Sequence, residues 1–347
     1  MANGLKKVQY QSDIIPPTDF DTVYYAEKDD VVAYMRIPVA IVVLNDGTTV
    51  KLLSPIISQG EIAPKIWNQS DGGYWDLDYE SEKVISLNNL KRLILPEGIV
   101  IHDGDTDSLF RGYENLEYIE LSHDFSEIGD EMFYGCSNLT SVTISDSVTI
   151  IESNAFYYCT ALASITIPDS VMSIGIYAFC HCTALTSITI PDSVMSIGSN
   201  AFGGCSSLSS VTISNSVESI GDYTFGSCSS LASITIPDSV MSIGSNAFDS
   251  CSSLSSITIG NSVESIGNYA FGSCSSLASV TIPDSVMSIG NYAFDDCTAL
   301  SSITIPDSVM SIGNYAFYKC TNLTAIYYNG SLKGFPWGAT NATLNPS

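Results

Sequence analysis

The chain has 347 residues and a formal net charge of −25 at pH 7, with 37 Asp and Glu residues against 12 Lys and Arg residues. No Lys or Arg occurs between residues 112 and 318, a stretch that contains 20 Asp and Glu residues. Nucleic-acid binding needs cationic side chains that displace the counterions of the phosphates. The charge distribution therefore excludes DNA, RNA and anionic lipid as expected partners.

No segment of the sequence predicts a membrane span or an export signal. The most apolar run, Ile37–Leu44, has eight residues and contains Pro38, whereas a helix that crosses a bilayer needs about 20. The first ten residues contain Lys6 and Lys7, but no apolar segment of the signal-peptide kind follows them. We therefore expect neither a transmembrane segment nor a Sec signal.

Residues 1–82 are interpreted as a small β-rich module that attaches or oligomerises the protein. Asn45-Asp46-Gly47 is a hairpin turn signal between two of its predicted strands. The sequence indicates no catalytic role for this module. Segments rich in Val, Ile, Thr and Tyr predict its strands: Thr22–Tyr25, Val31–Tyr34, Pro38–Leu44 and Thr48–Leu53.

A 23-residue unit recurs from about Leu87 almost to the C-terminus, and it defines a second domain over residues 83–347. A repeat of this length predicts a solenoid, in which each coil stacks on its neighbours. We expect a β-rich solenoid of about 11 coils of 23 residues. Nine cysteines mark the repeat: Cys136, Cys159, Cys182, Cys205, Cys228, Cys251, Cys274, Cys297 and Cys320.

Divergent units at both ends of the array predict caps, because an end coil has one face without a neighbour. Tyr113 takes the cysteine position in an early unit. In the last unit, Leu332, Phe335 and Trp337 depart from the regular pattern.

Within a unit, apolar residues alternate with Ser and Thr, which predicts a strand with one buried face. A glycine such as Gly290 predicts a backbone conformation that a side chain would forbid. The Ala-Phe-x-x-Cys segment predicts a short helical turn. In the coil that begins at Cys205, the predicted core residues are Leu208, Val211, Ile213, Val217, Ile220 and Phe225.

The nine repeat cysteines have Leu, Ile and Phe as neighbours, so we expect a ladder of free, buried thiols. Cys180 lies outside the register and is the candidate for an exposed or reactive thiol. Cys180, His181 and Cys182 are adjacent, but zinc usually takes four ligands at wider spacing. With three histidines and no nucleophile motif, we expect no enzyme, no metal and no cofactor.

The unit Leu-x-x-Ile-x-Ile-Pro-x-x-Val-x-x-Ile-Gly-x-x-Ala-Phe-x-x-Cys resembles the BspA-like class of leucine-rich repeats, over about residues 87–332. The resemblance implies a cell-surface protein of bacteria or protozoa that binds host proteins or glycans. The opening of the chain, with Val8-Gln9-Tyr10, Pro16-Pro17 and Val23-Tyr24-Tyr25, resembles N-terminal segments of phage tail and head-fibre proteins. Such proteins need no export signal.

These resemblances imply a non-enzymatic protein for surface recognition or adhesion. Without an export signal, the expected location is a virion surface, as a fibre or decoration protein. If a leader is missing, the expected location is a bacterial cell surface, as an adhesin. The partner would be a host cell-surface protein or glycan, and residues 1–82 would hold a homo-oligomer such as a trimer together. A structural spacer without a ligand is the further alternative.

Rows of residues that repeat from coil to coil are the candidate binding sites. Exposed tyrosines are favoured binding anchors, although Asn154, Asn200 and Asn246 at the same position indicate a tolerant site. A row of threonine hydroxyl groups offers a docking surface for a partner, but threonine is also favoured on any solvent-exposed strand. The candidates are Tyr177, Tyr223, Tyr269, Tyr292, Tyr315, Thr189, Thr212, Thr235 and Thr258.

An acidic row has two interpretations, because stacked carboxylates can bind Ca²⁺ or cap turns. Where the row changes to Asn215 and Asn261, Glu218 and Glu264 appear three residues later, in a position that is otherwise Met. The row consists of Asp146, Asp169, Asp192, Asn215, Asp238, Asn261, Asp284 and Asp307.

Overall fold

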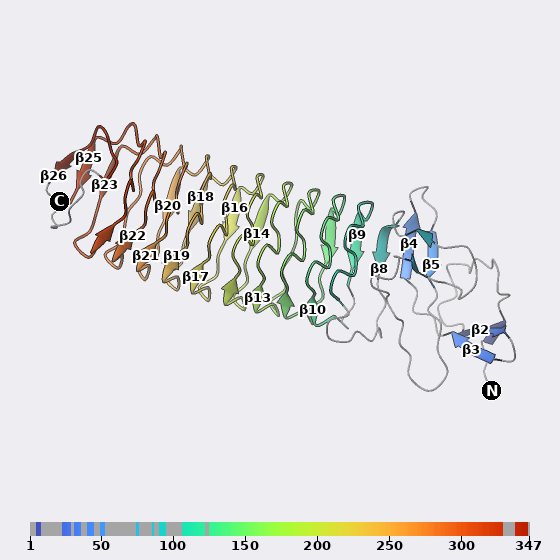
Figure 1. Cartoon of the computed structure of the whole chain (residues 1–347). Coiled ribbons are helices and arrows are strands. Elements are labelled where there is room, and N and C mark those ends of the chain that lie inside the picture. The colour runs from blue at the N-terminus through green and yellow to red at the C-terminus, as the bar shows by residue number, and fades with distance from the viewer. Residues whose placement is uncertain are drawn as a thin grey trace.

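The computed structural model describes residues 106–121, 125–328 and 337–345, together with the backbone of eight strands between residues 5 and 94. The described coils stack one after another into a rod, in the order of the chain (Figure 1). The described residues contain strands and turns and no helix. Among them there is accordingly no helix of the length and apolar character that crossing a membrane requires.

Each coil contributes two short strand positions, so two rows of strands run along the rod. Each row is divided into several short sheets, within which neighbouring strands pair in parallel and in register, so that Ser187 is the partner of Ser210 and Ile266 of Ile289. The first row consists of β9 (Tyr118–Glu120), β11 (Ser141–Thr143), β14 (Ser187–Thr189), β16 (Ser210–Thr212), β18 (Ser233–Thr235), β20 (Ser256–Thr258), β23 (Ser302–Thr304) and β25 (Ala325–Tyr327). The second row consists of β10 (Glu127–Ile128), β12 (Ile150–Ile151), β13 (Ser173–Ile174), β15 (Ser196–Ile197), β17 (Ser219–Ile220), β19 (Ser242–Ile243), β21 (Ser265–Ile266), β22 (Ser288–Ile289) and β24 (Ser311–Ile312).

Three N-terminal strands, β8 (Leu90–Ile94), β4 (Ala40–Leu44) and β5 (Thr49–Leu52), extend the first row. β4 and β5 form the antiparallel hairpin predicted around Asn45-Asp46-Gly47. β4 also pairs with β8, and β8 pairs in parallel with β9, so one sheet has the order β11-β9-β8-β4-β5. The four predicted strands are confirmed, while the boundary at residue 82 stays a prediction. The N-terminal strands are β1 (Leu5–Lys7), β2 (Val23–Lys28), β3 (Val31–Met35), β4 (Ala40–Leu44), β5 (Thr49–Leu52), β6 (Tyr74–Trp75), β7 (Ile85–Ser86) and β8 (Leu90–Ile94).

The core is a ladder of like side chains from successive coils. Ten stacked phenylalanines, Phe110 to Phe317, are fully buried, with ring centroids 5.0 to 5.6 Å apart between neighbours. The predicted core of the coil at Cys205 is confirmed, with Val211 half-buried. Repetition of one packing contact therefore builds the interior of the rod.

The cysteine ladder is confirmed, because all nine repeat cysteines are free and buried. Each thiol donates to the carbonyl oxygen of a phenylalanine 26 residues earlier, as Cys251 does to Phe225 at 3.2 Å. Burial raises the pKa of Cys251 to about 12, which keeps its thiol protonated. The prediction of exposure for Cys180 is wrong, because this side chain is also buried and burial raises its pKa to about 11.

The predicted helical turn in the Ala-Phe-x-x-Cys segment is also wrong. The N–H groups of Tyr177, Phe179 and His181 donate to carbonyl oxygens of the next coil at 2.7 to 3.0 Å. Tyr177 and His181 have φ of 57° and 60°, which interrupts any right-handed helical run. Every second backbone N–H of this segment is hydrogen-bonded to the next coil. These bonds between coils override the local preference for a helical turn.

The repeated glycines are needed because adjacent coils approach each other closely there, and not because their φ is unusual. Gly290 does not have a left-handed φ. A Cβ atom on Gly290 would lie 2.5 Å from the carbonyl carbon of Gly267 and 2.6 Å from the amide nitrogen of Asn268. The coils therefore touch backbone to backbone at this position.

Both caps contain the predicted residues that lie within the described part of the chain. Tyr113 is buried in the cysteine position. At the other end Trp337 is buried, with its ring edge-on to Tyr328 at 5.9 Å, and β26 (Thr343–Asn345) pairs in parallel with β25. Leu332 and Phe335 lie outside the described residues.

Candidate functional site

The five candidate tyrosines share one backbone conformation, with φ between 52° and 58°. Asn154, Asn200 and Asn246 occupy the same position with φ of 56° to 58°. Asparagine is enriched in this left-handed region, whereas a bulky tyrosine is uncommon there. The position therefore favours asparagine on backbone grounds.

Three of the five tyrosines stack on one another. The ring centroids of Tyr269 and Tyr292 are 4.8 Å apart with an interplanar angle of 2°, and those of Tyr292 and Tyr315 are 5.3 Å apart at 18°. Tyr318 meets Tyr315 edge-on at 5.6 Å. Tyr177 instead contacts Tyr157 in an aromatic group of the earlier coils. The structure thus brings the three C-terminal tyrosines together into one site.

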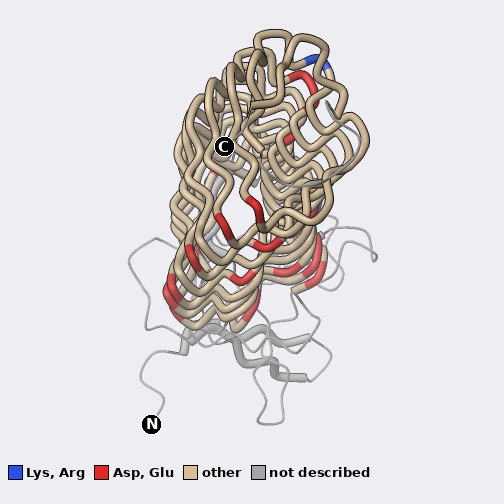
Figure 2. Tube along the Cα trace, turned by 90° about the vertical axis from the view of Figure 1, so that its left-hand side faces the viewer, with Lys and Arg blue, Asp and Glu red and all other residues tan. Residues whose placement is uncertain are grey.

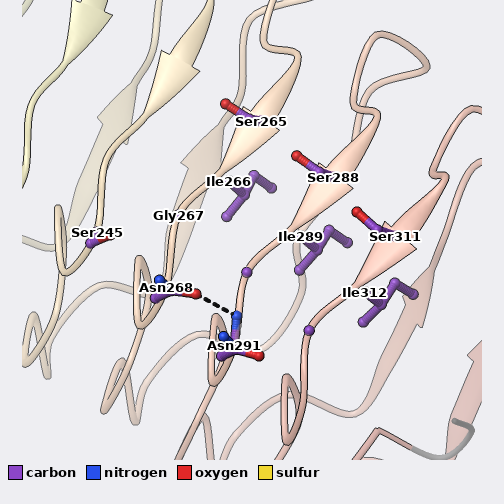
Figure 3. Close-up of a pocket in the computed structure, with 12 residues that line it drawn as sticks. Ser245, Ser265, Ile266, Gly267, Asn268, Ser288, Ile289, Asn291, Ser311 and Ile312 are labelled. Atoms are coloured by element: carbon purple, nitrogen blue, oxygen red, sulfur yellow. Dashed lines mark hydrogen bonds between the residues drawn. The ribbon is translucent and has the colours of Figure 1, made fainter.

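An asparagine ladder runs beside the tyrosine stack. The side-chain oxygen of Asn268 accepts the backbone N–H of Asn291 at 2.7 Å (Figure 3), and that of Asn291 accepts the N–H of Asn314 at 2.8 Å. The sequence analysis missed these asparagines, although the repeated Asn-Tyr pair was a signal for them. We call the six residues the Asn–Tyr ladder: Asn268, Tyr269, Asn291, Tyr292, Asn314 and Tyr315.

A shallow groove of about 390 Å³ adjoins the Asn–Tyr ladder on the second row of strands. Gly267, Gly290 and Gly313 are part of its lining, at the position where adjacent coils touch backbone to backbone. Figure 3 shows Ser265, Ser288 and Ser311 on the strands, with Asn268 and Asn291 on the loops that follow. The groove therefore offers hydroxyl and amide groups next to the tyrosine stack.

The tyrosine stack shifts the acidity of its central phenol. Partial desolvation and then the neighbouring Tyr269, Tyr315 and Asp295 raise the pKa of Tyr292, so its hydroxyl stays protonated and can both donate and accept hydrogen bonds. Lys319 lies 5.3 Å from the centroid of the Tyr318 ring. The site thus has an aromatic centre with polar groups around it.

The four candidate threonines are all exposed, as predicted, and alternate with buried isoleucines, except that the half-buried Val211 precedes Thr212. Thr189 pairs with Thr212, and Thr235 pairs with Thr258. They form a flat hydroxyl surface on the first row of strands, whereas the groove lies along the second row. The structure does not join the threonine row to the tyrosine stack as one site.

The other polar candidates have structural partners. The carboxylate of Asp238 accepts the backbone N–H of Asn261 at 2.7 Å, which supports turn capping at that coil. The thiol of Cys182 donates to the carbonyl oxygen of Phe156 at 3.2 Å, and the ring of His181 stacks on Tyr158 at 4.7 Å. Within the described residues, no three His, Cys, Asp or Glu side chains are grouped so that they could hold a metal ion.

The BspA type leucine-rich repeat region matches this chain over residues 82–207, 149–274 and 241–343. A leucine-rich repeat protein of Bacteroides ovatus is 26% identical over 72% of this chain and 92% of its own, with a TM-score of 0.37. A leucine-rich cell surface protein of Faecalibacterium prausnitzii is 28% identical over 73% and 86%, also at 0.37. The leucine-rich repeat protein of T. pallidum is 27% identical over 54% and 77%, at 0.40. No curated protein matches the chain.

Proposed function

Because this chain belongs to the BspA-type leucine-rich repeat proteins, we propose that it is a non-enzymatic recognition protein whose Asn–Tyr ladder binds a protein partner. The observation that carries this proposal is the stack of Tyr269, Tyr292 and Tyr315, which lies at the surface in a backbone conformation that favours asparagine. Tyrosine is enriched at protein interfaces, so a stack of surface tyrosines is a candidate binding site.

The stacking geometry favours a protein over a glycan. A sugar ring packs on an open aromatic face, but Tyr269 and Tyr315 cover both faces of Tyr292. At the central ring of the stack, the ring edge and the hydroxyl group are what remain for a partner. These groups suit the side chains and backbone of a protein interface, in which tyrosine is enriched.

Preorganisation also supports binding at this ladder. Tyrosine has two side-chain torsions, and stacking restricts them before a partner arrives. The hydrogen bonds from Asn268 and Asn291 to the next coil fix the backbone on either side of the rings. Little conformational entropy is then lost on association.

Family membership supports a bacterial cell surface as the location, with the rod acting as an adhesin. The virion fibre is the second location, and it depends on the N-terminal resemblance alone. In both versions residues 1–82 attach the rod, and in the virion version they hold a homotrimer together. The mass of the intact chain in solution, compared with a chain that lacks residues 1–82, separates a trimeric fibre from a monomeric adhesin.

The binding site is tested by replacing Tyr269, Tyr292 and Tyr315 with asparagine, the residue that occupies this position in other coils. The variant is expected to fold, because asparagine suits the left-handed φ at each position. The matched control is Tyr223→Asn, which changes an exposed tyrosine of the same row and conformation. Wild type and both variants are applied to an array of cell-surface proteins and to a glycan array.

We expect the wild type and Tyr223→Asn to bind the same proteins, and the triple variant to lose at least about tenfold in affinity, as for loss of interface anchors. Equal binding by the triple variant would remove the Asn–Tyr ladder from the proposal. Binding confined to the glycan array would refute the choice of a protein partner. Circular dichroism of the three chains checks that their folds agree.

A further inference from the structure

A row of exposed methionines lies on a part of the rod that the proposed function does not use. Met195, Met241 and Met287 are 58%, 49% and 38% exposed. Glu218 and Glu264 occupy the same repeat position in the coils between them, and both are exposed. We call these five residues the Met–Glu stripe. It combines apolar surface with negative charge in alternation, and the exposed Met172 and Met310 continue the row at its two ends.

The backbone holds this alternation in register. The N–H of Met241 donates to the carbonyl oxygen of Glu218 at 2.8 Å, and the N–H of Glu264 donates to that of Met241 at 2.8 Å. Backbone hydrogen bonds between parallel, in-register strands space neighbouring coils about 4.8 Å apart, so the two glutamates lie about 9.6 Å apart along the rod.

The two glutamates have no basic neighbour to neutralise them. No Lys or Arg occurs between residues 112 and 318. Figure 2 shows the same imbalance, with Asp and Glu at many places along the described coils and hardly any Lys or Arg. Asp238, three residues before Met241, is already hydrogen-bonded to Asn261. A partner of this stripe must therefore bring positive charge together with apolar groups.

The spacing selects a helix as that partner. An α-helix rises 1.5 Å per residue, so seven residues span about 10.5 Å and half that interval about 5.3 Å. An extended strand presents one face every two residues, about 6.6 Å apart, and loses register with the stripe within two coils. A helix lying along the rod departs from the spacing of the stripe by only about 0.5 Å per coil, so it stays much closer to register than a strand does.

We infer that the Met–Glu stripe binds a cationic amphipathic helix of a partner protein, with apolar residues every seven positions and Lys or Arg three or four residues after each. The apolar residues contact Met195, Met241 and Met287, and the two basic residues pair with Glu218 and Glu264. Methionine suits this role, because its flexible side chain adapts to different apolar shapes. The stripe is separate from the Asn–Tyr ladder, so either site can fail its test without the other.

The test uses the full chain and two labelled helical peptides of about 18 residues. In the first, leucines repeat every seven residues and an arginine follows each by four. The second has the same composition, with the arginines moved to the opposite face of the helix. Fluorescence anisotropy measures the dissociation constant of each peptide at several salt concentrations.

Two double variants make the test specific. Glu218→Met with Glu264→Met removes both stripe carboxylates and installs the residue that other coils carry at this position. Asp146→Asn with Asp169→Asn removes the same charge elsewhere on the rod, and asparagine occurs at that position in other coils. Both variants are therefore expected to fold.

We expect the first peptide to bind more tightly than the second, and the glutamate variant to weaken its binding about tenfold, as for two partly exposed ion pairs. The aspartate variant should change the affinity by less than about twofold. Equal binding of the two peptides would overturn the inference. So would an equal loss in the two double variants, because net charge alone would then account for the binding.

Discussion

Replacement of Gly290 by alanine tests whether contact between the backbones of adjacent coils controls the stability of this rod. The added Cβ would lie 2.5 Å from the carbonyl carbon of Gly267, about 1 Å closer than a normal contact between carbon atoms. Neither backbone can move away freely, because the N–H of Gly290 donates to Ile266 and that of Gly313 donates to Ile289, each at 2.8 Å. The two coils must separate or distort.

Overpacking of this kind costs about 1–3 kcal/mol. Against it stands a gain of about 0.4–1 kcal/mol, because alanine restricts the unfolded chain more than glycine does. We therefore expect a net loss of about 1–2 kcal/mol in the free energy of local opening around Gly290. Hydrogen exchange measured by mass spectrometry is the suitable assay, because a long repeat array need not unfold in one step.

Gly221 occupies the same repeat position and serves as the matched control. The nearest atom to its added Cβ would be the hydroxyl oxygen of Thr224 at 3.3 Å, whereas the nearest atom at Gly290 is a backbone carbon at 2.5 Å. The row of paired strands is also interrupted here, since β15 ends one sheet and β17 begins the next. We expect Gly221→Ala to leave exchange unchanged or to slow it. Equal acceleration of exchange by both substitutions, or none by Gly290→Ala, would refute the close-contact argument.

Three further outcomes follow from the core and the caps. In the native chain, the ten buried thiols should not react with iodoacetamide at pH 7.5, and all ten should react after unfolding in denaturant. Burial raises the pKa of Cys251 to about 12, above its value near 9 in the unfolded chain. Its contribution to stability is therefore present below pH 9 and is lost as the pH rises towards 12. The midpoint of thermal unfolding should accordingly fall between pH 8 and pH 11. Trp337→Ala should destabilise the C-terminal coil by about 3–5 kcal/mol and accelerate exchange of the Phe317 amide, which donates to Trp337, while the amide of Phe156 keeps its wild-type rate.

Much of the fold was predictable from the sequence because the same residue recurs in the same environment. The cysteine period of 23 residues predicted the stacking of coils, and the apolar positions around Cys205 predicted the core. Tyr113 and Trp337 were recognisable as cap residues, because they depart from a pattern that is otherwise regular. Burial in a repeat array follows the period closely, so a pattern of residue types was enough to predict it.

The candidate site was predictable only in part. The sequence indicated a row of exposed tyrosines, but not that Tyr292 would have a ring stacked on each face while Tyr177 joined a different group. It also indicated a helical turn where alternate amides in fact donate to the next coil. These features depend on partners about 22 residues away in the sequence, so local propensity does not determine them.

Gly221 and Gly290 show the same division between sequence and tertiary structure. Their repeat position is identical, and the sequence therefore assigned both the same role. Only the stacked coils distinguish a site where a methyl group would meet backbone at 2.5 Å from one where it would meet a side-chain hydroxyl at 3.3 Å. The sequence by itself determined the period, the core and the rows of surface residues. The spacing of adjacent coils, which the tertiary structure alone decides, determined which of those residues touch.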